Sequence, residues 1–142
     1  MPAVDSVAGT IALVGDRWTL LILREAFFGV RRFGQMQRNL EVAKTVLSAR
    51  LKLLTAEGLL ERVAYREDPV WFEYRLTAKG LDLWPVVVAL LQWGDKHLQS
   101  GDPPIRLRHT TCGHADGAVL VCAHCREPVD ARAARPEAGR LG

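Results

Sequence analysis

Two closely spaced pairs of metal-binding side chains lie near the C-terminus of this 142-residue chain. His109 and Cys112 are separated by two residues, and so are Cys122 and Cys125. Thiolate and imidazole groups paired in this way can surround a zinc ion tetrahedrally. The pattern therefore predicts a structural zinc site with three cysteines and one histidine, formed by His109, Cys112, Cys122 and Cys125. A closed site with four protein ligands leaves no position open for catalysis.

Three alternatives to this site remain open from the sequence. His114 or His124 could replace His109 as the histidine ligand. Cys122 and Cys125 could form a redox pair, although such a pair normally needs a thioredoxin-like unit that this short segment cannot build. The cysteines could also be reduced thiols in a mobile tail. A zinc deaminase is disfavoured because its metal site requires a nearby His-x-Glu, whereas the chain has His114-Ala115-Asp116.

The composition is that of one soluble globular domain, with 49% hydrophobic and 25% charged residues. A chain of this length buries roughly two-thirds of its unfolded surface, so its core needs neither disulfides nor metal. The longest apolar run, residues 83–91, contains Pro85 and is much shorter than the ~20 residues that cross a bilayer. The N-terminus also lacks the basic region of a signal peptide. We therefore expect a cytoplasmic protein with no membrane partner, and the net charge of +3 is compatible with nucleic-acid binding.

A change of composition at Ser100-Gly101-Asp102-Pro103-Pro104 divides the chain, because glycine and paired prolines interrupt a helix. We expect a first domain over residues 1–100 and a Cys/His module over residues 101–130. The remaining residues 131–142, rich in Ala, Arg, Pro and Gly, are expected to form a flexible tail.

Helical patterns account for most of the first domain. A short stretch over residues 4–14 precedes a helix over residues 17–28, with Asp16 at its N-cap and Gly29 just past its end. Two short helices then follow closely, and their apolar residues recur at helical spacing. These residues are Phe33, Met36 and Leu40 in the first helix and Leu47, Leu51 and Leu54, before Gly58, in the second.

A β-hairpin and a last helix complete the first domain. Phe72, Tyr74 and Leu76 alternate with other residues as in a half-buried strand, and residues 59–66 are its expected antiparallel partner. The connection Glu67-Asp68-Pro69-Val70 has the composition of a turn. Thr77 is expected to cap a long helix that runs to about residue 99, with a kink at Pro85. This order predicts a mainly α fold with a small β-hairpin, a winged helix-turn-helix, followed by a short zinc-ribbon-like Cys/His appendage.

Six motifs occur in order within residues 5–98. They are Val14-Gly15-Asp16-Arg17-Trp18-Thr19-Leu20-Leu21-Ile22-Leu23-Arg24, Arg32-Phe33, Val46-Leu47-Ser48-Ala49-Arg50-Leu51, Gly58-Leu59-Leu60-Glu61-Arg62, Tyr74-Arg75-Leu76-Thr77-Ala78-Lys79-Gly80 and Trp93-Gly94-Asp95. Together they resemble the signature of the HxlR family of bacterial winged-helix transcriptional regulators. The resemblance implies a homodimeric DNA-binding protein that acts as a repressor or an activator.

The chain departs from this family at Asp5. Many members of the family have a cysteine just ahead of the first helix, and in some of them it is a redox sensor. Because Asp5 is the corresponding residue here, thiol sensing at this position is not expected. A small-molecule effector, or no effector, is the better hypothesis.

The second of the two short helices is the expected recognition helix. At about 100° per residue, its leucines form one stripe and its polar residues face away from them. Hydroxyl, methyl and ammonium groups on that face suit base edges, thymine methyls and phosphates, although a merely solvated helix face would look similar. Arg50 lies at the edge of the leucine stripe, and the family resemblance makes it a DNA contact. The expected contacts from this helix are Lys44, Thr45, Ser48, Ala49, Arg50 and Lys52.

A second group of residues is expected to bind phosphates, because the helix before the recognition helix crosses the DNA backbone. These residues are Arg31, Arg32, Gln35 and Arg38. Arg32 could instead hold the start of its helix against the core. In the hairpin, Arg66 and Arg75 flank a turn with two acidic residues that DNA repels, so this wing tip should bind weakly. Trp71 could pack on a sugar or an arginine, or cover the open face of the hairpin.

The last helix carries two apolar stripes, of which one suffices for a core. The other, together with the N-terminal helices, is expected to meet a partner subunit through Leu83, Val86, Leu90 and Trp93. Two-fold symmetry would place the recognition helices about 34 Å apart on a pseudo-palindromic operator. Aromatic residues near the interface could line an effector pocket or simply pack there. The candidates for this pocket are Trp18, Phe27, Phe28 and Trp84.

The sequence thus predicts a transcriptional regulator that binds double-stranded DNA as a homodimer, and regulation by a small-molecule effector is a further hypothesis. The alternative is a protein-interaction or redox module that uses the Cys/His segment on a winged-helix scaffold. An enzyme is not expected, because no phosphate-binding glycine loop, nucleophile elbow or pair of catalytic carboxylates is visible.

Overall fold

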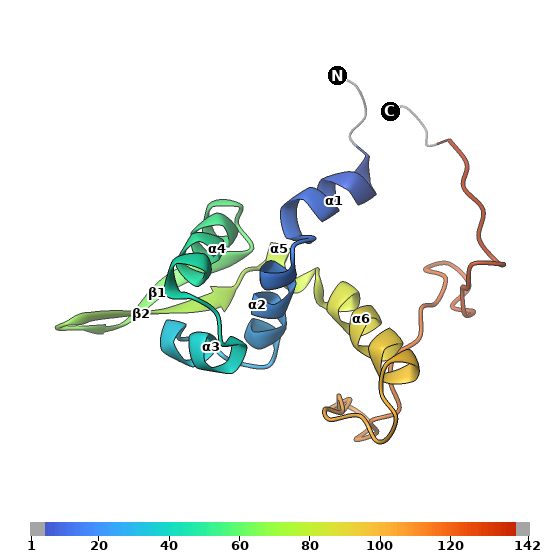
Figure 1. Ribbon diagram of the computed structural model, residues 1–142. Helices are drawn as coiled ribbons and strands as arrows, with labels where there is room; N and C mark the ends of the chain where they lie inside the picture. Colours follow the sequence, from blue (N-terminus) through green and yellow to red (C-terminus); the bar gives the residue numbers. More distant parts are fainter. Residues whose placement is uncertain (1–4, 139–142) are drawn as a thin grey trace. The chain divides into compact units, whose positions relative to one another are not determined.

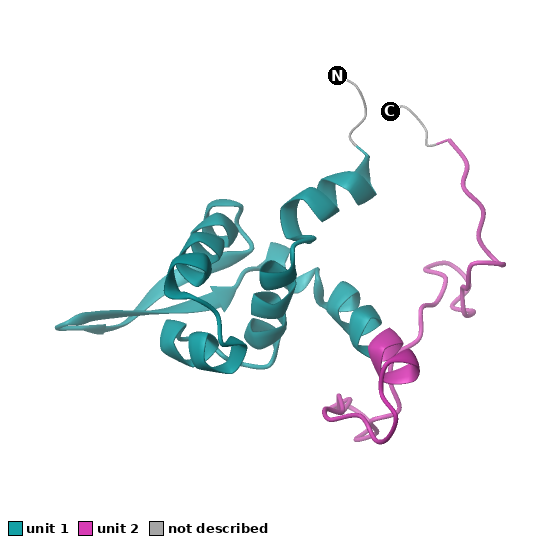
Figure 2. Cartoon of the chain, in the orientation of Figure 1, with its two compact units in different colours: residues 1–91 teal, residues 92–142 magenta. Residues whose placement is uncertain are grey.

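The structure, a computed structural model, describes residues 5–138 (Figure 1). Residues 1–4 and 139–142, which begin the predicted first domain and end the predicted tail, lie outside the described residues. In chain order the elements are α1 (Ser6–Val14), α2 (Arg17–Phe27), α3 (Phe33–Leu40), α4 (Lys44–Ala56), β1 (Leu60–Glu67), β2 (Val70–Leu76), α5 (Ala78–Leu81) and α6 (Trp84–His97). The chain divides into two compact units, residues 1–91 and 92–142 (Figure 2). This boundary falls inside α6, whereas the composition places it near residue 100.

The helix boundaries predicted around α2 are confirmed. The Asp16 carboxylate caps α2 by accepting hydrogen bonds from the backbone N–H groups of Trp18 and Thr19, each at 3.1 Å. At the other end, Gly29 follows the C-cap and adopts a φ of 90°, which favours glycine. Asp5 caps α1 in the same manner, because its carboxylate accepts from the N–H of Ala8 at 2.9 Å.

The core of the first unit lies among α2, α3, α4 and the start of β1. The predicted stripe of Leu47, Leu51 and Leu54 on α4 is fully buried, which confirms the predicted orientation of this helix. Ile22, Leu23 and Met36 share this core and are also fully buried. Burial of side chains of this size removes apolar surface from water and holds the three helices together.

The predicted hairpin is present as an antiparallel β1–β2 pair. A bulge at Tyr65 shifts the register, so that Ala64 pairs with Phe72 and Arg66 pairs with Trp71. The alternation expected for a half-buried strand has one exception, because Glu73 is 8% exposed although it lies on the predicted polar face. Its carboxylate accepts hydrogen bonds from the guanidinium of Arg75, which satisfies the buried charge.

The single long helix predicted after Thr77 is wrong. Thr77 caps only the short α5, accepting from the N–H of Gly80 at 3.1 Å, and the chain breaks before α6. Pro85 is therefore the second residue of a new helix and does not kink an existing one. In the first turn its missing N–H costs no helical hydrogen bond, which explains why the helix restarts there.

In the second unit, the described residues after α6 form turns and one isolated bridge between Val121 and Pro128. The Gln92 side chain, near the end of α6, donates to the carbonyl of Ala118 at 3.0 Å and accepts from its N–H at 2.6 Å. These elements do not show a zinc ribbon, which stays a prediction.

None of the described helices is by itself long and apolar enough to cross a membrane. Joined together, α1 and α2 meet the length and composition criteria, but a bend of 82° separates them.

Candidate nucleic-acid interface

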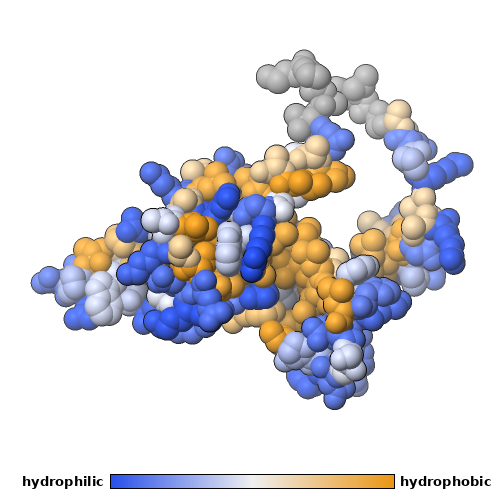
Figure 3. Space-filling view, in the orientation of Figure 1, coloured by the Kyte–Doolittle hydropathy of each residue, from blue (hydrophilic) through white to orange (hydrophobic). Residues whose placement is uncertain are grey.

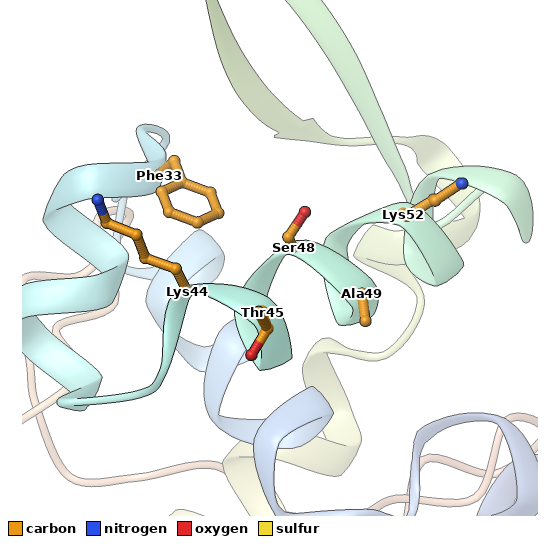
Figure 4. Close-up of a pocket in the computed structure, with 6 residues that line it drawn as sticks. All are labelled: Phe33, Lys44, Thr45, Ser48, Ala49 and Lys52. Atoms are coloured by element: carbon orange, nitrogen blue, oxygen red, sulfur yellow. The ribbon is translucent and has the colours of Figure 1, made fainter.

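The side of α4 opposite its buried leucines is open to solvent. The exposed residues on this side are Lys44, Thr45, Ser48, Ala49 and Lys52. With Phe33 from the start of α3, they line a surface hollow of 490 Å³ (Figure 4). This face combines ammonium, hydroxyl and methyl groups on a rigid helix, which are the groups that read base edges and bind phosphates.

Arg50 differs from these residues because its side chain is half-buried and paired. Its Nε lies 3.5 Å from Oδ2 of Asp16, the oxygen that caps α2. Burial alone would raise the pKa of Asp16, but hydrogen bonds from Thr19 and Trp18 and the charge of Arg50 lower it below its ordinary value. Asp16 therefore joins the start of α2 to α4.

A chain of hydrogen bonds orders the side chains on α3. Arg38 donates to Gln35 at 2.8 Å, and Gln35 donates to Asn39 at 2.8 Å. Asn39 then donates at 2.8 Å to Glu25, a buried residue of α2 that also accepts from Arg24 at 3.1 Å. The predicted phosphate contacts Gln35 and Arg38 are thus exposed at the outer end of a network that begins in the core.

The two arginines ahead of α3 both contact the hairpin. The guanidinium of Arg32 lies 4.1 Å from the ring centroid of Tyr65, a cation–π contact. The carbonyl of Arg31 accepts a hydrogen bond from the N–H of Tyr74 at 2.7 Å. Arg32 therefore packs on the wing, and both arginine side chains remain exposed.

Arginines on the hairpin stack on its aromatic rings. Arg66 lies 4.6 Å from the centroid of Trp71, and Arg62 lies 3.6 Å from that of Phe72. Of the hypotheses for Trp71, packing on an arginine is the one observed. Arg75, by contrast, is paired with the carboxylate of Glu73.

The residues predicted for the dimer interface and effector pocket occupy different environments. Val86, Leu90 and Trp93 on α6 are exposed, by 39%, 54% and 60%, whereas Leu83 packs against the core. The rings of Phe27 and Trp84 lie 5.1 Å apart and pack on each other. Trp18 packs on the core below the guanidinium of Arg17, and Phe28 is half-buried at the end of α2.

In the Cys/His segment, the side chains of His109 and Cys112 lie close together. Sγ of Cys112 lies 3.4 Å from Nδ1 of His109. Hydrogen bonds from the backbone of Cys125 and of His124 and from the Cys125 thiol lower the pKa of Cys122 below the ordinary thiol value. Among residues 5–138, no three His, Cys, Asp or Glu side chains are grouped so as to hold a metal ion.

Sequence patterns missed the partners of these side chains. Nothing in the spacing indicated that Asp16 would reach Arg50 or that Tyr65 would lie under Arg32, because both contacts join distant segments. A weak signal existed for Arg62 and Phe72, since a cation and an aromatic ring on facing strands commonly stack.

The exposed face of α4, the helix that precedes it and the hairpin together define a winged helix-turn-helix protein. The family model described as HxlR-like helix-turn-helix matches residues 13–102, and the chain belongs to this family. The family predicted from the motifs is therefore confirmed, and the protein is a transcriptional regulator of the helix-turn-helix type.

Similar proteins include other regulators. An uncharacterized HTH-type transcriptional regulator of Mycobacterium tuberculosis, Rv3095, is 56% identical over 136 residues, covering 95% of this chain and 86% of the relative. Another from Synechocystis is 38% identical over 90 residues, covering 63% of this chain and 67% of the relative. The crystal structure of PA1607, a candidate transcription factor, is similar with a TM-score of 0.83 and 36% identity, covering 96% of each chain. The reduced form of the redox regulator HypR has a TM-score of 0.62 and 27% identity, covering 67% of this chain and 95% of that one.

Proposed function

We propose that this regulator binds a pseudo-palindromic operator as a homodimer, with α4 in the major groove and the hairpin along the DNA backbone. The observation that carries the proposal is the division of α4 into a buried leucine stripe and an exposed face with two lysines, two hydroxyls and a methyl group. A helix with this arrangement can be held rigidly by the core while its other side contacts bases. A protein of this class acts on DNA in the cytoplasm.

The proposed base contacts are Thr45, Ser48, Ala49 and Lys52, and the proposed phosphate contacts are Arg31, Arg32, Gln35, Arg38, Lys44 and Arg66. Arg38 and Gln35 are ordered by the hydrogen bonds on α3, so less side-chain freedom is lost when they bind. Arg50 and Arg75 are also proposed contacts, but each already pairs with a carboxylate, so we expect them to contribute less.

The proposed dimer uses apolar surface that the first unit leaves uncovered. On α1, Val7 and Ile11 are 69% and 62% exposed, and α6 exposes Val86 and Leu90. Figure 3 shows apolar surface over both helices. Patches of this kind on a small protein commonly mark an interface. A two-fold dimer would then present two recognition helices to successive turns of DNA.

A small-molecule effector is part of the same proposal, with Trp18, Phe27, Phe28 and Trp84 as candidate contacts. The paired rings of Phe27 and Trp84 join α2 to the start of α6. A ligand that separates these rings would shift α6 relative to α2 and could thereby alter DNA affinity. Fluorescence of the four tryptophans of the chain during ligand titration would test this directly.

The test of DNA binding is a salt-dependent titration against the protein's own promoter region and a scrambled duplex. Affinity should fall steeply between ~50 and ~200 mM salt, whereas a protein-interaction module need not show this dependence. Arg38→Ala should weaken binding to every sequence by roughly 1 to 3 kcal/mol and reduce the salt slope, while Ser48→Ala should also change sequence preference.

Arg132→Ala is the matched control for the loss of charge, because Arg132 is an exposed arginine of the second unit. Equal affinity of the wild type and Arg38→Ala, or an equal loss in Arg132→Ala, would contradict the proposed docking.

A further inference from the structure

The two Cys/His pairs of the second unit lie in turns with the same backbone hydrogen bonds. In the first turn, the N–H of His109 donates to the carbonyl of His114, and the N–H of Gly113 donates to the carbonyl of His109, both at 2.8 Å. In the second turn, the N–H of Cys122 donates to the carbonyl of Glu127 at 2.8 Å, and the N–H of Arg126 donates to the carbonyl of Cys122 at 2.9 Å. His109 and Cys122 therefore occupy equivalent positions.

The same residue of each turn adopts a left-handed conformation. Gly113 has a φ of 76°, and Arg126 at the equivalent position has a φ of 66°. A positive φ is uncommon for a residue with a side chain, so the conformation at Arg126 reflects a specific turn and not a random coil. Two segments with unrelated sequences around their paired residues thus form one kind of turn.

The side chains of the first turn lie at the separation expected for two ligands of one zinc ion. In a tetrahedral site with a zinc–sulfur distance of about 2.3 Å and a zinc–nitrogen distance of about 2.0 Å, sulfur and nitrogen lie about 3.5 Å apart. Sγ of Cys112 and Nδ1 of His109 lie 3.4 Å apart. In the second turn, the N–H of His124 donates to Sγ of Cys122 at 3.4 Å, the kind of hydrogen bond that orients a ligating thiolate.

We propose that zinc joins the two turns through His109, Cys112, Cys122 and Cys125. Each turn supplies two ligands, and the nine residues between Cys112 and Cys122 connect them. Within residues 5–138 no three such side chains are grouped around one point, so the proposal requires that metal binding bring the two turns together. Three thiolates and one imidazole form a donor set that favours tetrahedral zinc.

The equivalent backbone positions of the two turns also indicate which histidine is the fourth ligand. His109 corresponds to Cys122, the first ligand of the second turn, whereas His124 lies between the paired residues of its own turn. His114 corresponds to Glu127, outside the pair, and its Nδ1 lies 3.1 Å from the carbonyl of Cys112. The structure thus assigns His109 as the fourth ligand and leaves the other two histidines outside the site.

The test is the zinc content of the purified full-length protein, kept reduced, loaded with zinc alone and dialysed. The wild type should retain about one zinc per chain, and His109→Ala and Cys112→Ser should retain less than about a tenth of that amount. His109→Cys should keep the metal, because thiolate is an equally suitable ligand. The matched controls His114→Ala and His124→Ala should bind zinc as the wild type does.

Two further measurements distinguish a bound zinc ion from free thiols and from a disulfide. With cobalt(II) in place of zinc, the wild type should show thiolate-to-metal charge-transfer absorption that changes in His109→Cys. The thiols should react slowly with a thiol reagent until a chelator is added. The proposal is overturned if the reduced wild type retains no zinc, if His114→Ala loses as much metal as His109→Ala, or if a Cys122–Cys125 disulfide is the stable form.

Discussion

Replacement of Asp16 should weaken both the start of α2 and its attachment to α4. Its carboxylate accepts two backbone hydrogen bonds of 3.1 Å at the N-terminus of α2 and lies 3.5 Å from Arg50. Loss of an N-cap side chain costs about 1 kcal/mol, and a partly exposed ion pair contributes about 0.2–1 kcal/mol. Asp16→Ala should therefore lower the free energy of unfolding by about 1–2 kcal/mol.

Asp16→Asn is the matched control. Asparagine is also a good N-cap residue, so this variant should lose only the ion-pair part, less than about 1 kcal/mol. Urea denaturation at a fixed protein concentration measures both values, because association with a partner subunit would otherwise change the apparent stability.

A double-mutant cycle with Arg50→Ala isolates the pair. The coupling energy between Asp16 and Arg50 should be about 0.2–1 kcal/mol. The reasoning is refuted if Asp16→Ala unfolds within about 0.3 kcal/mol of the wild type, or if Asp16→Asn is as damaging as Asp16→Ala. The same Arg50→Ala protein reports on DNA: because Arg50 is paired with Asp16, its loss should reduce the salt slope by less than the change of about 1 expected for an unpaired phosphate contact.

Three other outcomes follow from the structure. The pKa of Asp16 is lowered in the folded state, so the contribution of Asp16 to stability should be complete above the ordinary aspartate pKa of 3.8 and lost as pH falls further. In acid denaturation curves, the difference in stability between the wild type and Asp16→Asn should therefore vanish. Leu51→Ala should cost about 2–5 kcal/mol by urea denaturation, because Leu51 is fully buried, and a loss under about 1 kcal/mol would mean that α4 is packed differently. Leu90→Glu should shift the protein toward a monomer in analytical ultracentrifugation with unchanged helix content, and an unaltered dimer would place the interface elsewhere.

The parts of the fold with local signals could be predicted from sequence. The stripe of Leu47, Leu51 and Leu54 defines a buried face by its spacing alone, and Asp16 and Gly29 mark helix ends by their backbone preferences. The break between α5 and α6 could not be placed, because Pro85 suits both a kink and the first turn of a new helix. Packing of the following segment decides between the two.

The candidate interface was predictable as a set of residues but not as a set of interactions. The exposed polar residues of α4 follow from the leucine stripe, since they occupy the remaining side of the helix. The partners of Arg32 and Arg50 depend on tertiary contacts that no local pattern encodes. Glu73 and Arg75 are neighbours on one face of β2, so their pairing is local, but the burial of Glu73 is not. The alternating pattern of β2 places Glu73 on the exposed face, whereas its carboxylate is buried against Arg75.

The existing partners of these arginines determine how many ions DNA binding would release. An arginine paired with a carboxylate, such as Arg50 or Arg75, adds little net charge at its position, so it displaces few cations from the phosphates. Arg32 and Arg66 keep their full charge, because an aromatic ring does not neutralise it. The slope of log affinity against log salt concentration therefore depends on the number of basic residues without a carboxylate partner. Its magnitude should be smaller than the number of basic residues on this surface.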